Sequence, residues 1–268
     1  VERSRGLGDV YKRQPYYLLK EYINLKDMKI IQKPLVSYLD AELREAAKNF
    51  SKRHNLRFCT PREIRKSFSS NLIILVTDKG IFLQDLSLKN SKPFDLNFIS
   101  FRERLNNKNL IEKCFLKFDK KYRVYDLSAG FCFDAFIISS LGFDVQAYEK
   151  ESWLFEFTSE NLKKDRVKNI NLINKNSLDI LKTIQAQSII YLDPMFGVDN
   201  KSFAKKEMHF LRKSLQDDSE NLLENALNSK AELVVLKKHK LDDLKTEKKP
   251  SFKLTGKVVS LNIFDRRN

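Results

Sequence analysis

The alternation of apolar and polar positions is clearest in residues 124–149, where it predicts a strand, a helix and a second strand. A short apolar run ends at Asp126 and is followed by a turn of small residues. Apolar positions from 131 to 141 recur at helical spacing, and residues 145–148 predict a second strand that ends in Glu149. This order is typical of the unit that opens a nucleotide-binding domain.

The small residues Ser128, Ala129 and Gly130 would let the turn approach a ligand closely, beside the free N–H groups at the start of the helix. Glu149 follows Asp126 by 23 residues. An acidic residue about 20 positions further on is the usual acceptor for ribose hydroxyls in such sites. We therefore expect Asp126, Gly130 and Glu149 to face a bound nucleoside.

The same alternation of strands and helices continues downstream. The pattern predicts a helix over residues 153–164, a strand over 170–173, a helix over 178–184 with Ser177 as its N-cap, and a strand over 188–192. Asn176 and Ser177 follow the third strand, where a doubly wound fold reads an adenine ring. Simple capping explains these two residues equally well.

The fourth strand runs directly into Asp193, Pro194, Met195 and Phe196. Pro194 fixes its backbone angle and removes a donor, so the loop offers carbonyl groups. Asp193 can accept a hydrogen bond from an amine, and Phe196 can stack on a flat base. An ordinary strand-to-helix turn is the alternative interpretation, because Asp-Pro is common in turns.

The N-terminal part predicts a small α+β domain. Its elements are a helix over residues 37–52, a hairpin formed by 71–76 and 81–83, and a further strand over 93–98. The polar, basic segment 102–109 marks the expected domain junction.

We therefore expect domains over residues 28–109 and 110–268. Residues 1–14 resemble a translated adapter or vector scar, and Met28 is the expected native start, so residues 1–27 are left out of the fold prediction.

Composition limits the class of protein. With 268 residues, 42% of them hydrophobic and 32% charged, the chain can bury a sizeable core. No apolar run approaches the roughly 18 residues that span a bilayer, and no secretory segment is evident, so we expect a cytoplasmic protein with no membrane partner. The three cysteines and three histidines show no metal-ligand spacing, which predicts no metal.

The formal net charge of +15 favours a polyanionic partner, most simply nucleic acid. A solvated surface in a Lys- and Asn-rich chain is the alternative. The basic residues of segment 201–213 and those after the fifth predicted strand, including Lys237 and Lys238, are candidates for phosphate contact.

Several motifs together resemble the RsmJ family of S-adenosylmethionine-dependent methyltransferases, which act on a guanine 2-amino group of small-subunit (16S) ribosomal RNA. The similarity runs from about Leu72 to Phe264. The motifs that carry it are Asp126-Leu127-Ser128-Ala129-Gly130, Phe133-Asp134-Ala135-Phe136, Tyr191-Leu192-Asp193-Pro194-Met195-Phe196, Lys205-Lys206-Glu207-Met208 and Val234-Val235-Leu236-Lys237-Lys238.

The resemblance implies a class I, Rossmann-like methyltransferase fold, a seven-stranded mixed sheet with helices on both faces that ends in a hairpin around Gly256. It implies S-adenosylmethionine as cofactor and 16S ribosomal RNA, or the small ribosomal subunit, as partner. The implied catalytic residues are Asp193, Pro194 and Phe196. The implied cofactor-binding residues are Asp126, Gly130, Phe133, Asp134, Glu149, Lys150, Asn176, Ser177 and Asp193.

Two departures from the family pattern matter. The family has Gly-Arg before the aspartate that aligns with Asp134, whereas this chain has Cys132-Phe133. The family also has a Gly-rich basic stretch where this chain reads 102–107 without glycine. A small buried side chain is expected of Cys132, with a reactive thiol as the alternative.

Three other functions stay open on the sequence alone. A DNA amino-methyltransferase would share the cofactor loop and the Asp-Pro loop, but its usual second proline is absent. A non-catalytic RNA-binding protein would have a degenerate pocket, and a dinucleotide-dependent oxidoreductase would need a full G-x-G-x-x-G motif that is missing.

Overall fold

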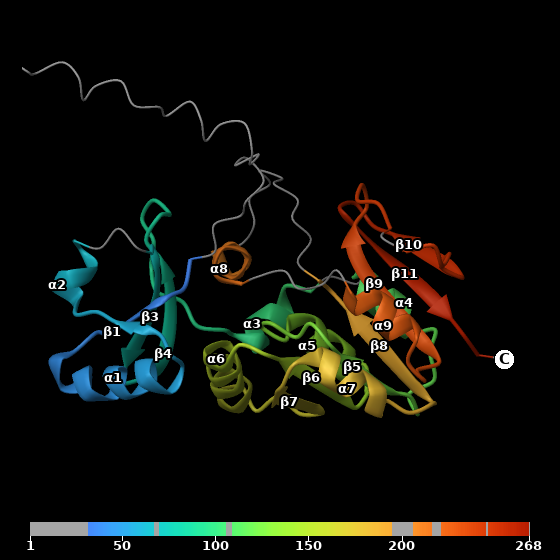
Figure 1. The fold of residues 1–268 in the computed structure, drawn as a ribbon, viewed down its shortest axis with the longest axis horizontal. Coiled ribbons are helices and arrows are strands. Elements are labelled where there is room, and N and C mark those ends of the chain that lie inside the picture. The colour runs from blue at the N-terminus through green and yellow to red at the C-terminus, as the bar shows by residue number, and fades with distance from the viewer. Residues whose placement is uncertain are drawn as a thin grey trace, which may run out of the picture. The chain divides into compact units, whose positions relative to one another are not determined.

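The computed structural model describes residues 32–66, 70–105, 109–194, 206–215, 221–244 and 246–267. Predictions for residues 1–31, the proposed native start at Met28 and the catalytic role of Phe196 lie outside these ranges. Figure 1 shows the elements in order along the chain.

The larger sheet has seven strands in the order β10-β11-β9-β8-β5-β6-β7. Strands β7, β6, β5, β8 and β9 are parallel, β11 is antiparallel to β9, and β10 closes a hairpin with β11. The predicted class I fold is confirmed. The strands are β5 (Arg123–Asp126), β6 (Val145–Glu149), β7 (Ile170–Asn174), β8 (Ser188–Leu192), β9 (Leu233–His239), β10 (Phe252–Thr255) and β11 (Val259–Asp265).

Helices cover both faces of this sheet, which is why residues 189–192 of β8 and 233–236 of β9 form continuous apolar runs. Along β8, Ile189 and Tyr191 belong to one hydrophobic cluster, and Ile190 and Leu192 belong to a second. On the larger sheet, the first cluster includes residues of α4 (Leu110–Phe115), α5 (Phe133–Ser140), α6 (Ser152–Lys164) and α8 (Lys206–Ser214). The second cluster includes residues of α7 (Ser177–Ile180), its continuation η2 (Leu181–Thr183) and α9 (Leu222–Leu227).

The smaller sheet has the order β2-β1-β3-β4. Its β3–β4 hairpin turns through Gly80, whose φ of +109° favours glycine, and confirms the predicted hairpin. The elements of this part are β1 (Leu35–Tyr38), η1 (Ala41–Leu43), α1 (Arg44–Arg53), β2 (Arg57–Phe58), α2 (Pro61–Ile64), β3 (Leu72–Thr77) and β4 (Gly80–Asp85).

The predicted start of the first helix is wrong. Ser37 and Tyr38 belong to β1, where they pair with Leu75 and Val76 of β3. The α-helix starts only at Arg44, and Leu39, expected on its apolar side, is 59% exposed. The pairing partner lies almost forty residues away, so a local pattern could not show it.

The segment 93–109 also differs from its prediction. Only Phe94 makes an isolated β-bridge, to Leu83, and Asn97 then caps helix α3 (Phe98–Glu103) through a 2.7 Å bond from the Ser100 N–H. Phe101 of α3 stacks on Phe133 of α5 with ring centroids 4.4 Å apart. The segment expected to be the domain junction therefore contains helix α3, which packs against α5 of the larger sheet. The domain boundary at residue 109 stays a prediction.

Asp85, at the end of β4, connects the smaller sheet to α8. The carboxylate is 1% exposed and accepts bonds from His209 Nδ1 at 2.7 Å, Lys213 Nζ at 3.1 Å and Ser87 Oγ at 2.7 Å. Burial opposes ionisation, yet these donors lower the pKa of Asp85. The contact fixes α8 to β4.

We expect Asp85→Ala to lower the free energy of unfolding by about 3 kcal/mol, because the Lys213 ammonium, the His209 ring and the Ser87 hydroxyl lose a buried acceptor. Chemical denaturation measures this change. Asp78→Ala, at an exposed position of the same hairpin, is the matched control and should cost less than about 0.5 kcal/mol. Equal effects of the two substitutions would show that the contact to α8 contributes nothing.

Candidate functional site

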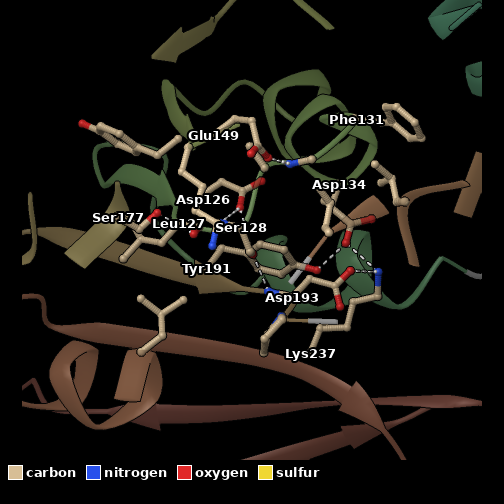
Figure 2. A pocket seen from close by; sticks show the side chains of 18 of the residues that line it. Asp126, Leu127, Ser128, Phe131, Asp134, Glu149, Ser177, Tyr191, Asp193 and Lys237 are labelled. Carbon is tan, nitrogen blue, oxygen red and sulfur yellow. Dashed lines mark hydrogen bonds and ion pairs between the residues drawn. The ribbon is translucent and has the colours of Figure 1, made fainter. Parts of the chain in front are cut away.

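The turn after β5 is built around the buried side chain of Asp126. Its Oδ1 accepts hydrogen bonds from the Ser128 N–H at 3.0 Å and the Ser128 hydroxyl at 3.3 Å. The Leu127 N–H donates to the Tyr191 carbonyl at 3.1 Å, which joins the turn to the end of β8. Figure 2 shows these side chains around one cavity.

Gly130 is the residue of the turn that most needs to be glycine. Its φ is +50°, and an added Cβ would lie 3.5 Å from Cδ1 of Leu211 on α8. Its carbonyl accepts from Thr158 Oγ1 at 3.1 Å and its N–H donates to Glu149 Oε2 at 3.2 Å. The turn is thus fixed from both α6 and β6.

Cys132 adopts the left-handed conformation at the residue before α5, with φ of +57°. Cys132 stands where the family resemblance leads one to expect glycine, and an L residue is less favourable in this conformation. The thiol is 1% exposed, and burial raises its pKa well above the usual value. The expectation of a small buried side chain is confirmed, and burial disfavours the thiolate that a reactive thiol would need.

Glu149 ends β6 and is 7% exposed. Besides the bond from Gly130, its Oε1 accepts from the Glu151 N–H at 2.8 Å. Burial raises the pKa of Glu149 to about 7. Near this pH the side chain is present in both protonation states. Either state can form hydrogen bonds with hydroxyl groups, because a hydroxyl group both donates and accepts.

Burial also raises the pKa of Asp126 to about 7, with smaller contributions from the negative charges of Asp134 and Asp193. The folded chain therefore holds this proton more tightly than the unfolded chain, whose aspartates titrate near about 4. Stability that comes from this group is present at low pH and is lost as the pH rises through about 7.

We expect Asp126→Asn to become progressively more stable relative to the unaltered chain as the pH rises from 5 to 7. The difference in unfolding free energy should change by about 2 kcal/mol over that range, because asparagine has no proton to lose. Denaturation at several pH values measures it, with Asp243→Asn at an exposed position as control. A difference that is independent of pH would contradict the raised pKa of Asp126.

The loop after β7 differs in one detail from the prediction. Asn176, not Ser177, is the N-cap of α7, and its side chain accepts from the Leu178 N–H at 3.0 Å. The Ser177 hydroxyl instead donates to the Leu127 carbonyl at 2.6 Å. Ser177 therefore joins the third-strand loop to the first as the first residue of the helix, and Asn176, whose backbone is extended (φ −70°, ψ 129°), takes the capping position.

Asp193 and Pro194 follow β8 at the same edge of the sheet. The Asp193 N–H donates to Ser128 Oγ at 2.6 Å, so one serine hydroxyl bridges the ends of β5 and β8. The Asp193 side chain is 31% exposed. Burial raises the pKa of Asp193 to about 6, so the site contains a carboxyl group that titrates near neutrality, which the sequence alone did not suggest.

Lys237 of β9 lies between two carboxylates. Its Nζ is 2.6 Å from Asp134 Oδ2 and 2.8 Å from Asp193 Oδ2, and the Tyr191 hydroxyl donates to the same Asp134 oxygen at 2.7 Å (Figure 2). Burial alone would raise the pKa of Asp134, but the charge and hydrogen bond of Lys237 lower it. The pKa of Lys237 is raised despite burial, because both carboxylates stabilise its charge.

The expected contact of Lys237 and Lys238 with phosphate is therefore wrong for both residues. Lys237 is occupied by its two ion pairs, and Lys238 is 5% exposed with its Nζ donating to the carbonyls of His239 and Asp242. Ser128, Tyr191 and Lys237 are site residues that the sequence prediction missed. The sequence feature that could have indicated Lys237 is its position directly after the four apolar residues 233–236 of a strand.

All the predicted site residues that the structure describes line a single cavity of about 240 Å³. Met208 and Leu211 of α8 complete its wall, so the contact of α8 with Asp85 also supports the cavity. The predicted residues brought together there are Asp126, Gly130, Phe133, Asp134, Glu149, Lys150, Asn176, Ser177, Asp193 and Pro194. The cavity lies at the carboxyl ends of β5, β6, β8 and β9, where open α/β sheets bind ligands.

Within the described residues, no group of three or more His, Cys, Asp or Glu side chains could hold a metal ion. None of the helices described is long and apolar enough to cross a membrane.

Comparison with known proteins agrees with the fold and the cavity. Residues 57–266 match a family model described as "Putative SAM-dependent methyltransferase". A SAM-dependent methyltransferase from Neisseria gonorrhoeae has a similar fold, with a TM-score of 0.59 at 19% identity, over 87% of this chain and 96% of that one. Fold and family model define the class: an S-adenosylmethionine-dependent methyltransferase with a Rossmann-like sheet.

Two relatives show to which family of these methyltransferases the chain belongs. Ribosomal RNA small subunit methyltransferase J of Buchnera aphidicola is 30% identical over 73% of this chain and 87% of that protein. The protein of the same name from Pseudomonas aeruginosa is 25% identical over 87% of this chain and 94% of its own length. The chain belongs to the family of ribosomal RNA small subunit methyltransferase J, and its cofactor is S-adenosylmethionine.

The donor set fits that cofactor. Glu149 offers carboxylate oxygens at the end of the second parallel strand, and Gly130 lines the cavity from the first turn without a side chain of its own. Asn176 and Ser177 border the same cavity from the third-strand loop. This is the order in which a doubly wound sheet presents its residues to a nucleoside.

Proposed function

We propose that this protein methylates the exocyclic 2-amino group of a guanine in small-subunit (16S) ribosomal RNA. The observation that carries the proposal is the position of Asp193 and Pro194, which border the same cavity as Glu149 and Asp126. An acceptor group at Asp193 would thus lie beside the cofactor. The names of the relatives support ribosomal RNA as the substrate.

S-adenosylmethionine supplies an electrophilic methyl group with a good leaving group, so the protein has mainly to position and to stabilise charge. Asp193 and the Pro194 carbonyl accept the hydrogens of the guanine amine, whose lone pair is otherwise delocalised into the ring. The nitrogen gains the methyl carbon and gives up one proton, which the carboxylate of Asp193 accepts and passes to water. Its pKa of about 6 suits that transfer near neutral pH.

The target guanine has to leave its stack to enter the cavity. We propose that Phe196 then holds the base by stacking, which contributes about 1–3 kcal/mol per base in other proteins. We also assign Lys206 and Arg212, both exposed on α8, to phosphate contacts beside the cavity. Residues 28–109 would form a separate N-terminal domain that adds surface for the folded RNA. A cytoplasmic location follows from such a substrate.

Transfer of labelled methyl groups tests the acceptor. The purified protein would be incubated with methyl-labelled S-adenosylmethionine and, in parallel, naked 16S ribosomal RNA, assembled small subunits, large-subunit RNA or duplex DNA. We expect label only in naked 16S ribosomal RNA or in assembled small subunits. Label in DNA would favour a DNA amino-methyltransferase. Cofactor binding without label in any acceptor would favour a non-catalytic RNA-binding protein.

A further inference from the structure

Lys237 of β9 lines the cavity and is held there by contacts from the residue that follows β8 and from helix α5. Strand β9 pairs with β8 so that Leu236 lies opposite Leu192, which places Lys237 directly beside Asp193. Asp134 approaches from the first turn of α5, and Tyr191 of β8 donates to it. The side chains of Lys237 and Asp134 are 20% and 18% exposed, so solvent screens their attraction only in part.

We propose that Lys237 is a positioning residue that fixes the Asp193 carboxylate for the methyl acceptor through its ion pairs with Asp193 and Asp134. The proposal rests on the function proposed above, since it assumes that Asp193 faces the acceptor amine. The proposal gives Lys237 a role inside the site, whereas the sequence alone suggests only a basic residue for phosphate contact.

Two contacts fix Asp193. Its backbone N–H is bound by Ser128 Oγ at 2.6 Å, and its Oδ2 is bound by Lys237 Nζ at 2.8 Å. The ion pair therefore restricts the rotation of the carboxyl group and leaves the other oxygen, Oδ1, for the acceptor. A group held in one orientation loses little freedom when the substrate arrives, which is the advantage of a preorganised site.

Lys237 also keeps Asp193 ionised. The carboxylates of Asp134 and Asp193 share one cation, and Asp126 adds a third negative charge nearby, so without that cation the cluster would take up protons. Tyr191 contributes only a neutral hydroxyl, since burial raises its pKa well above the usual value. Removing the Lys237 charge should thus raise the pKa of Asp193 beyond about 6.

The test compares Lys237→Met, which removes the charge at similar length, with Lys237→Arg, which retains it. For Lys237→Met we expect kcat at pH 7 to fall at least about 30-fold, with the KM for S-adenosylmethionine changed less than about threefold. The acid limb of the pH–rate profile should move up by at least about one pH unit. Lys237→Arg should retain the wild-type acid limb. Lys253→Met, exposed on β10, is the matched control.

A second readout needs no substrate. Carboxyl-carbon NMR of the cofactor-free protein follows the titration of Asp193 directly, and we expect its midpoint to rise by at least about one pH unit in Lys237→Met only. An unchanged midpoint and an unchanged acid limb in that variant would overturn the proposal. If the wild-type protein methylates no guanine, the function proposed above fails, while the NMR titration still decides whether Lys237 controls Asp193.

Discussion

Replacing Asp193 by asparagine is expected to lower the rate of guanine methylation at least about a hundredfold. Asparagine keeps the size of the side chain and one acceptor oxygen, but it cannot take the amine proton or stabilise the positive charge that develops on nitrogen. Loss of one preorganised group of this kind costs about 3 kcal/mol in other enzymes. The bond from the Asp193 N–H to Ser128 is a backbone contact and should persist.

The same substitution should leave cofactor affinity within about fivefold of wild type, because Asp193 acts on the acceptor. Steady-state methylation kinetics and calorimetric titration with S-adenosylmethionine separate the two effects. Asp243→Asn, exposed and away from the cavity, controls for the loss of one negative charge. Near-wild-type methylation by Asp193→Asn would remove the catalytic role assigned to this residue.

Replacing Glu149 by alanine is expected to weaken S-adenosylmethionine binding at least about 30-fold. The substitution removes the oxygens assigned to the ribose hydroxyls, and it also frees the Gly130 and Glu151 N–H groups from their acceptor. Losing a hydrogen-bonded charged group at a ligand site costs about 2–3 kcal/mol. Calorimetry with S-adenosylmethionine, and with NAD as a comparison ligand that should not bind, measures the change.

Glu149→Gln separates ligand binding from folding. Glutamine retains one of the two acceptor oxygens that serve the Gly130 and Glu151 N–H groups, so it should lower the thermal midpoint less than Glu149→Ala does, whereas binding should still weaken about tenfold. Should Glu149→Ala bind the methyl donor as tightly as wild type while remaining folded, the acidic residue at the end of β6 would have no part in cofactor binding.

The elements predicted correctly are those whose pattern is local. The β5–α5–β6 unit was predicted because its apolar periodicity, its small-residue turn and Glu149 lie within about 25 residues. The start of α1 was not, because Ser37 and Tyr38 take their conformation from pairing with β3. Helix α3 was missed because its stability comes from Phe133 on α5, distant in sequence.

The residues of the candidate site also differ in whether the local sequence pattern could predict them. Residues at the ends of single strands, such as Glu149 and Asp193, follow from the order of elements alone. Lys237 does not, because its importance depends on the register between β8 and β9 and on Asp134 approaching from α5. The contact of Ser177 with the Leu127 carbonyl likewise joins two loops that lie 50 residues apart, which no local pattern could show.

The most direct test of the account is mass spectrometry of the nucleosides released from small-subunit RNA after incubation with the protein and S-adenosylmethionine. We expect a single new product, N2-methylguanosine, that is absent when Asp193→Asn replaces the unaltered protein. A methyl group found on adenine, on cytosine or on a ribose hydroxyl would contradict the roles assigned to Asp193 and Pro194.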